Sequence, residues 1–185
     1  MVVGGFEKVY ELGRIFRNEG ISTKHNPEFT SVEIYQAFAN YIDMMDLTED
    51  LIKGAAINVL GTEDIKISVG NEQSIDETIS LNLNEPFERI SVFDSILKFN
   101  SSLRAQTLNS IDEASEFLRD LGCDIKPNWG LGKIQIEIFE KTVEQKLIKP
   151  TFITMYPAEV SPLARLNDEN SFVTDRFEFF VAGQE

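Results

Sequence analysis

The sequence predicts an α+β fold in which an antiparallel β-sheet is flanked by helices. Two observations support this prediction. Apolar and polar residues alternate over 8–16 and again over 28–35, with a polar stretch between them, which is the pattern of a long β-hairpin. Apolar residues also recur at helical spacing over 44–59 and over 132–147. Because no repeat or low-complexity linker interrupts the chain, 1–185 is expected to form one domain.

A loop, a helix and short strands are expected in the first half of the chain. The polar stretch 18–27 contains glycine and proline and is typical of a hairpin loop. The helix that follows has its apolar face formed by Met44, Leu47, Leu51, Ile52, Ala55 and Val59. Asp46 or Thr48 would cap its start, and Gly61 would end it. Short strands joined by polar turns are expected over 65–90.

Two further helices have recognisable ends. A helix over 91–99 would be capped by Ser91, with Asp94 at the spacing of a capping box. Another helix, over 111–121, would end at Gly122.

The last predicted helix covers 132–147 and would close before Pro150. Its apolar stripe consists of Ile136, Phe139, Val143 and Leu147. The segment Gly130-Leu131-Gly132-Lys133 looks like a phosphate-binding loop, but it lacks the spacing and the hydroxyl residue of that motif. It is predicted to start the helix instead. Strands are expected at the end of the chain, over 151–156 and 175–182.

Composition excludes several classes of function. The single cysteine, Cys123, excludes an internal disulfide, and with one histidine as well a structural zinc site is not expected. A net charge of −14 argues against nucleic-acid binding by this segment alone. No apolar run approaches the roughly 20 residues of a membrane helix, and the first residues lack the pattern of a signal peptide. A cytoplasmic protein without a membrane partner is therefore expected.

The hairpin gathers residues that suit a nucleotide. Arg17 follows a strand end, where its guanidinium could bind a phosphate through two parallel hydrogen bonds. His25 lies in the loop, within reach of outer phosphates, and Phe29 on the returning strand offers a flat face for a base. Taken singly, such residues are more often structural, because an exposed arginine usually forms a surface ion pair and a phenylalanine usually packs in the core.

The order of these residues changes that interpretation. Phe16-Arg17-Asn18-Glu19, a short loop and then His25-Asn26-Pro27-Glu28-Phe29-Thr30, with Glu33 following, resemble motif 2 of the class II aminoacyl-tRNA synthetases. The Arg-x-Glu and Glu-Phe-Thr parts are similar to the aspartyl, asparaginyl and lysyl subgroup. Further segments resemble the lysyl branch, with the weakest likeness over 62–108. They are Asn18 to Ser22, Lys149 to Thr154, Tyr156 to Ala164, Asp175 to Phe180 and Gly183 to Glu185.

The resemblance implies a role for each matching residue in binding ATP. Arg17 would bind the α-phosphate and the activated carboxyl group, and would be the catalytic residue. Glu19 would accept a hydrogen bond from the adenine amino group. His25 would contact the outer phosphates, and Phe29 would stack on adenine.

The resemblance also implies residues for lysine and for magnesium. Glu33 would hold the α-ammonium group of lysine, and Tyr35 would lie towards the lysine side chain. Glu178 and Glu185 would hold Mg²⁺ that bridges the ATP phosphates. A regular strand would place these two carboxylates on opposite faces, because their separation is odd. Gly183 permits a bend between them.

The implied activity is that of a lysine–tRNA ligase, which forms lysyl-adenylate from lysine and ATP and then transfers the lysyl group to tRNA(Lys). The whole enzyme is expected to be a homodimer. The family's anticodon-binding OB-fold and its motif 3 have no counterpart in the sequence, so 1–185 is expected to be a partial catalytic domain. Two alternatives stay open at this point. One is a synthetase paralogue that lysylates a protein, and the other is a non-enzymatic paralogue that serves as an interaction module.

Overall fold

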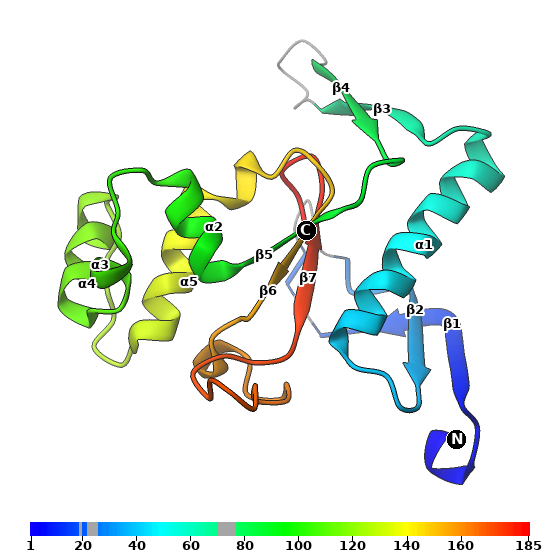
Figure 1. Cartoon of the computed structure of the whole chain (residues 1–185), viewed down its shortest axis with the longest axis horizontal. Coiled ribbons are helices and arrows are strands. Elements are labelled where there is room, and N and C mark those ends of the chain that lie inside the picture. Colours follow the sequence, from blue (N-terminus) through cyan, green and yellow to red (C-terminus); the bar gives the residue numbers. More distant parts are fainter. Residues whose placement is uncertain (19, 22–25, 70–76) are drawn as a thin grey trace. The chain divides into compact units, whose positions relative to one another are not determined.

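The computed structural model describes residues 1–18, 20–21, 26–69 and 77–185, and it confirms the predicted α+β class. The chain divides into two compact units, Met1–Asn40 and Tyr41–Glu185 (Figure 1). Within the described ranges, no helix is long and apolar enough to cross a membrane.

The first unit is built on a hairpin. After a short 3-10 helix, η1 (Val2–Gly4), strand β1 (Lys8–Phe16) pairs with the antiparallel strand β2 (Glu28–Gln36). Both predicted strands are confirmed to within one residue, because alternation of apolar and polar residues marks them clearly. The second unit starts with helix α1 (Tyr41–Leu60).

Helix α1 begins earlier than the sequence predicted. Asp46 and Thr48, proposed as its caps, lie inside the helix. Thr48 Oγ1 donates a hydrogen bond to the Met44 carbonyl at 2.7 Å, and Asp46 forms an ion pair with Arg89 at 2.5 Å. The prediction of its end is confirmed, since the helix stops before Gly61.

Two small sheets follow α1. Strands β3 (Asp64–Val69) and β4 (Glu77–Asn82) form an antiparallel hairpin. The second sheet has the order β5-β6-β7, with β5 (Glu88–Ser91), β6 (Thr151–Thr154) and β7 (Phe177–Phe180). These strands confirm the predicted run of short strands over 65–90.

The sheet β5-β6-β7 is mixed. Strands β6 and β7 are antiparallel, as expected, but β5 and β6 are parallel. A parallel pair needs a long crossover, and here a series of helices supplies it. The strands predicted over 151–156 and 175–182 are also shorter than expected. Met155 has a φ of +55° and Ala182 a φ of +54°, so neither residue can continue an extended strand.

The crossover between β5 and β6 is helical. Helix α2 (Val92–Phe99) is capped as predicted, since the Asp94 amide donates to Ser91 Oγ at 2.9 Å. Helix α3 (Ala105–Leu108) was not predicted. Helix α4 (Ile111–Asp120) ends just before Gly122 as expected.

Helix α5 (Leu131–Thr142) is five residues shorter at its C-terminus than the sequence suggested. The apolar residues that prolong its stripe, Val143 and Leu147, flank a separate 3-10 turn, η2 (Glu144–Lys146). A second 3-10 turn, η3 (Ala158–Val160), lies between β6 and β7.

Two apolar clusters lie on opposite faces of the sheet β5-β6-β7. Ile153 and Phe180 pack with helices α2, α4 and α5, which Figure 1 shows grouped beside the sheet. Phe152, the neighbour of Ile153, belongs to the other cluster, with Met45 and Ala56 of α1. Successive residues of a strand face opposite ways, so this short sheet is covered on both sides.

The glycine segment at the start of α5 is a helix start, as predicted. Glu159 of η3 caps this helix, because its carboxylate accepts hydrogen bonds from the Gly130 amide at 2.7 Å and the Lys133 amide at 3.1 Å. A Cβ atom on Gly132 would lie 2.7 Å from Pro157 Cβ, so the backbones approach too closely for any side chain there. The amides that could have bound a phosphate are therefore used to fix the η3 turn to α5.

Removing this cap should destabilise the second unit. We expect Glu159→Ala to lower the free energy of unfolding by about 0.5–2 kcal/mol, the usual cost of losing a helix cap. Urea titration followed by circular dichroism measures the change, with the exposed Glu169→Ala as the matched control. Equal unfolding midpoints for the two variants would contradict the capping role.

Candidate active site

The residues predicted to bind nucleotide and amino acid share one face of the hairpin. Directly opposed residues of antiparallel strands lie on the same face, and residues two apart in a strand do so as well. The opposed pairs on this face are Val9 with Tyr35, Glu11 with Glu33, Gly13 with Ser31 and Ile15 with Phe29. Arg17, two residues beyond Ile15, continues the same face. We call it the odd-numbered face of the hairpin.

Arg17 and Phe29 are neighbours at the loop end of this face. The Arg17 amide donates to the Pro27 carbonyl at 2.9 Å, which extends the β-ladder by one residue beyond β1. Its guanidinium carbon lies 5.3 Å from the centre of the Phe29 ring. A cation and an aromatic ring in this arrangement can bind a phosphate and a base of the same nucleotide. Arg14, by contrast, lies on the other face and forms an ion pair with Glu28.

Glu33 and Tyr35 are joined by a hydrogen bond. Tyr35 Oη donates to Glu33 Oε2 at 2.7 Å. This hydrogen bond raises the pKa of Tyr35, and the negative charge of Glu11 acts in the same direction. The carboxylate of Glu33 therefore has a hydrogen-bond donor on its own strand and on the same face.

Glu11 was missed as a candidate site residue. It lies directly opposite Glu33, and two carboxylates in such a pair repel each other unless a cation lies between or beside them. An ammonium group would relieve that repulsion. The signal was present in the sequence, because the register of two predicted strands places Glu11 on the same face as Glu33.

A hollow of about 540 Å³ adjoins these residues. It is lined by Met1, Val2, Val3, Val9, Tyr10, Glu11 and Tyr35. Its apolar wall and its carboxylate suit a ligand with an aliphatic stem and a positive charge. Small residues, Gly13 and Ser31, lie between this region and Phe29. Among the described residues outside the immediate chain neighbours, no atom lies within 4 Å of a Cβ atom placed on Gly13.

Two of the predicted ATP contacts lie outside the described residues. They are Glu19 and His25, both in the hairpin loop. Their roles stay predictions.

Glu178, the first predicted magnesium ligand, lies on β7 opposite Ile153. It therefore faces the same side of the sheet as Phe180, which packs on Phe139 of α5 with ring centres 5.7 Å apart. Its carboxylate forms an ion pair with Arg176. The side chain of Glu178 is about three-quarters buried, so this pairing compensates a carboxylate that is partly removed from water.

The bend predicted at Gly183 is confirmed. Val181 pairs with Gln184, and the two residues between them, Ala182 and Gly183, both have positive φ, as in a tight hairpin turn. The Gly183 amide donates to the Leu147 carbonyl at 2.9 Å, and a Cβ atom on Gly183 would lie 2.9 Å from the Gln145 carbonyl oxygen. The turn is thus docked on η2, and only glycine fits there.

Tyr156 lies beside Arg176, the ion-pair partner of Glu178. Tyr156 is 4% exposed, and the Arg176 guanidinium carbon is 4.4 Å from the centre of its ring. Burial raises the pKa of Tyr156; Arg176 opposes that change, and the negative charge of Glu185 adds to it.

Glu178 of β7 and Glu185, beyond the Gly183 turn, are the carboxylates predicted to hold magnesium. In the part of the chain that the structure describes, no group of three or more His, Cys, Asp or Glu side chains forms a metal site. Mg²⁺ bound with a nucleotide commonly uses one or two carboxylates, together with phosphate oxygens and water. Two carboxylates such as Glu178 and Glu185 would meet that requirement, and the pairing of these two with a metal stays a prediction.

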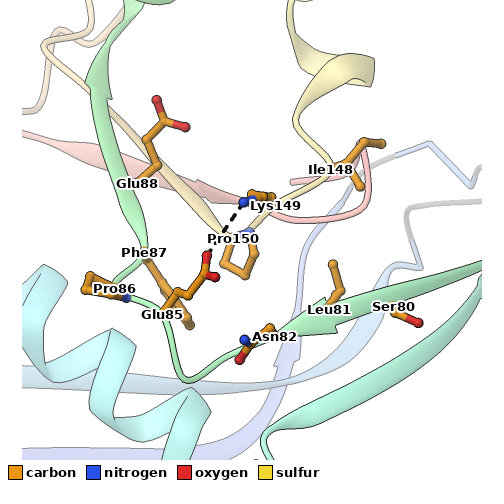
Figure 2. A pocket seen from close by; sticks show the side chains of 10 residues that line it. All are labelled: Ser80, Leu81, Asn82, Glu85, Pro86, Phe87, Glu88, Ile148, Lys149 and Pro150. Atoms are coloured by element: carbon orange, nitrogen blue, oxygen red, sulfur yellow. Dashed lines mark ion pairs between the residues drawn. The ribbon is translucent and has the colours of Figure 1, made fainter.

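A second hollow lies away from all of these residues. It has a volume of about 380 Å³ and lies near the amino ends of β5 and β6, between β4 and the residues around Pro150 (Figure 2). Figure 2 shows Glu85 directed towards Lys149, whose ammonium nitrogen is 3.6 Å from the carboxylate. Both side chains are more than 60% exposed, so this pair contributes little to stability. None of the predicted site residues lines this hollow.

Comparison with known proteins decides the family. A family model described as "tRNA synthetases class II (D, K and N)" matches residues 1–185. The chain belongs to this family. The resemblance inferred from motif 2 is therefore confirmed along the whole sequence, including 62–108, where the motifs are weakest.

Individual relatives are similar over the whole chain. The chain is 59% identical over 185 residues to a protein named lysine–tRNA ligase from Teredinibacter turnerae, of which it covers 36%. It is 54% identical over 186 residues to the lysine–tRNA ligase of Hahella chejuensis and covers 37% of it. It is 52% identical over 185 residues to that of Idiomarina loihiensis and covers 35% of it. The chain thus spans little more than a third of the length of these curated relatives.

Proposed function

We propose that this chain provides part of the catalytic domain of a lysine–tRNA ligase. The relatives named above carry that name, and they are similar to this chain over its full length. The observation that carries the proposal is the odd-numbered face of the hairpin, on which Arg17, Phe29, Glu33 and Tyr35 lie together. Four residues with separate predicted roles share one face, as a common ligand would require.

The proposed reaction has two steps. In the first, a carboxylate oxygen of lysine attacks the α-phosphorus of ATP, the bond to the bridging oxygen breaks, and pyrophosphate leaves with lysyl-adenylate as the product. In the second, a hydroxyl group of the terminal adenosine of tRNA(Lys) attacks the activated carbonyl carbon, and AMP leaves. Both steps depend mainly on positioning and charge neutralisation.

The hairpin residues would provide the positioning. Arg17 binds the α-phosphate and the lysine carboxylate, which brings the two reacting groups together. Phe29 stacks on adenine and Glu19 accepts a hydrogen bond from its amino group, while His25 contacts the outer phosphates. These assignments use the guanidinium and the ring in the arrangement that the structure shows, 5.3 Å apart.

Other residues of the hairpin would bind the substrate lysine. Glu33 would accept hydrogen bonds from the α-ammonium group. Tyr35, which donates a hydrogen bond to Glu33, would lie towards the lysine side chain. Glu11 adds negative charge opposite Glu33. Glu178 and Glu185 would hold Mg²⁺, which when bound neutralises charge on the ATP phosphates.

The remaining parts of the proposal concern partners. The complete protein would act in the cytoplasm as a homodimer, with lysine, ATP and tRNA(Lys) as its substrates. The region 1–185 would form one portion of its catalytic domain. The net charge of −14 does not favour RNA, so tRNA recognition would depend mainly on other parts of the complete protein.

A stable analogue of the intermediate tests this proposal. The 185-residue chain should bind the sulfamoyl analogue of lysyl-adenylate more tightly than the same compound without its α-ammonium group. Glu33→Gln should remove most of that preference, about 10- to 100-fold, because a hydrogen bond between charged groups is lost. Titration calorimetry measures the four affinities.

The matched control is Glu28→Gln, on the other face of the hairpin. It should keep the preference for the α-ammonium group. If the chain binds both compounds equally, or if Glu28→Gln loses the preference as fully as Glu33→Gln, the proposed lysine site is wrong.

A further inference from the structure

Arg176 is held from three sides in the second unit. Its guanidinium forms an ion pair with Glu178 and donates a hydrogen bond to Ser161 Oγ at 2.9 Å. It also lies over the face of the Tyr156 ring, 4.4 Å from the ring centre. A guanidinium with three fixed neighbours has few orientations available, so it holds any carboxylate that binds it in one direction.

The frame around Arg176 is itself rigid. The Thr174 amide and hydroxyl both donate to the Tyr156 carbonyl at 2.9 Å, and Thr174 and Tyr156 are buried. The turn that precedes Ser161 is fixed to helix α5 through Glu159, whose carboxylate accepts a hydrogen bond from the Gly130 amide. Helix α5 thus fixes, through η3, the position of Ser161, which accepts a hydrogen bond from Arg176.

Tyr156 contributes its ring face rather than its hydroxyl group. Among the described residues, Tyr156 Oη is the buried side-chain polar atom without a hydrogen-bond partner. An unpaired buried hydroxyl lowers stability. The ring face, by contrast, contacts the Arg176 guanidinium, at a distance typical of cation–π interactions.

The position of Glu178 makes an orienting partner necessary. It lies opposite Ile153 and on the same side of β7 as Phe180, so its carboxylate has apolar neighbours on the sheet. Arg176 contacts one carboxylate oxygen, Oε1. The second oxygen would then bind a cation, and the contact of Oε1 with Arg176 would set the direction in which it points.

We propose that Arg176 is a positioning residue that orients the Glu178 carboxylate for a divalent cation bound with a nucleotide. The inference rests on the proposed function in one respect, namely that Glu178 is a ligand of that cation. In this role Arg176 would act through the Glu178 carboxylate and would not itself contact the nucleotide or the metal. Groups that orient metal ligands in this way typically contribute 10- to 100-fold to metal affinity.

Manganese in place of magnesium provides a direct measurement. Binding of Mn²⁺ to the 185-residue chain with ATP present is followed by electron paramagnetic resonance, well below the unfolding temperature. We expect Arg176→Gln to weaken Mn²⁺ binding about 10- to 100-fold and Arg176→Lys to have an intermediate effect, because lysine keeps the charge and loses the planar fork. Arg165→Gln is the control, since Arg165 is exposed and pairs with Asp168 and Asp175.

The variant Glu178→Gln separates this inference from the proposed function. If Glu178→Gln weakens Mn²⁺ binding and Arg176→Gln binds Mn²⁺ as the wild type does, the positioning role of Arg176 is wrong. The assignment of Glu178 as a metal ligand is then supported. If Glu178→Gln binds Mn²⁺ as the wild type does, the metal assignment in the proposed function fails. Tighter binding by Arg176→Gln would show that Arg176 competes with the cation and would also overturn the inference. Should Arg176→Gln fail to fold, wild-type affinity in Arg176→Lys would overturn it.

Discussion

Replacing Arg17 by alanine is expected to remove most of the affinity of the chain for ATP·Mg. A guanidinium that binds a phosphate through charge-assisted hydrogen bonds contributes about 1.5–3 kcal/mol for each bond. The loss of even one such bond should raise the Kd about 10- to 100-fold. Arg17 also lies against Phe29, so the same substitution removes a neighbour of the proposed adenine platform. Titration calorimetry with ATP and Mg²⁺ gives the two affinities directly.

Arg14 supplies the control for this experiment. It lies on strand β1, shortly before Arg17, and is also an exposed arginine, but it lies on the opposite face and pairs with Glu28. Arg14→Ala should therefore bind ATP·Mg as the wild type does. Equal ATP·Mg affinity in the wild type and Arg17→Ala would contradict the assignment of Arg17 to the α-phosphate.

The largest effect on stability is expected from Phe152→Ala. Phe152 is fully buried in the centre of the sheet β5-β6-β7. Three aromatic rings surround it, those of Phe87, Phe177 and Phe179, with ring centres 5.3–5.9 Å away. Removing so large a side chain should lower the free energy of unfolding by about 3–5 kcal/mol. Urea-induced unfolding of the chain, followed by circular dichroism, measures that change.

Phe172→Ala is the comparison for Phe152→Ala. Phe172 is 39% exposed, so its removal leaves little cavity and should cost much less than the removal of Phe152. If both variants unfold at the same urea concentration, Phe152 does not hold the sheet together in the way that its burial indicates.

Local sequence patterns predicted the hairpin and most helix ends correctly, for physical reasons. The alternation over 8–16 and 28–35 is a property of strands with two different faces. The register of the two strands in the structure then places Phe29, Glu33 and Tyr35 on one face. Ser91 was recognised as a cap because a serine side chain can accept a hydrogen bond from a backbone amide of the first turn, which has no partner within the helix.

Other features depend on tertiary contacts that local patterns do not contain. The apolar residues Val143 and Leu147 continue the spacing of α5, so the sequence did not reveal the change to a 3-10 turn, which is where the Gly183 turn docks. The start of α1 was placed too late because Asp46 and Thr48 look like caps, while Asp46 in fact pairs with the distant Arg89. The parallel pairing of β5 and β6 joins strands that are far apart in the sequence.

The same limit applied to the candidate site. The family resemblance named Glu178 and Glu185, but the contacts of Arg176 with Tyr156 and Ser161 come from three segments that only the fold brings together. Glu11 could have been found from the strand register. The contacts of Arg176 could not have been found in this way, because no periodic pattern in the sequence connects η3 with the residues around β7.

The parallel pair β5 and β6 has a consequence for the order in which the second unit folds. Hairpins such as β3–β4 close between neighbours in the sequence and can form within microseconds. Glu88 can pair with Thr151 only after the chain has closed a loop that contains α2 to α5, and long loops close late because their ends must lose more conformational entropy. Phe180 of β7 packs on Phe139 of α5 and needs that closure as well. The surroundings of Glu178 are therefore complete only at a late stage of folding, after the helices that frame them have formed.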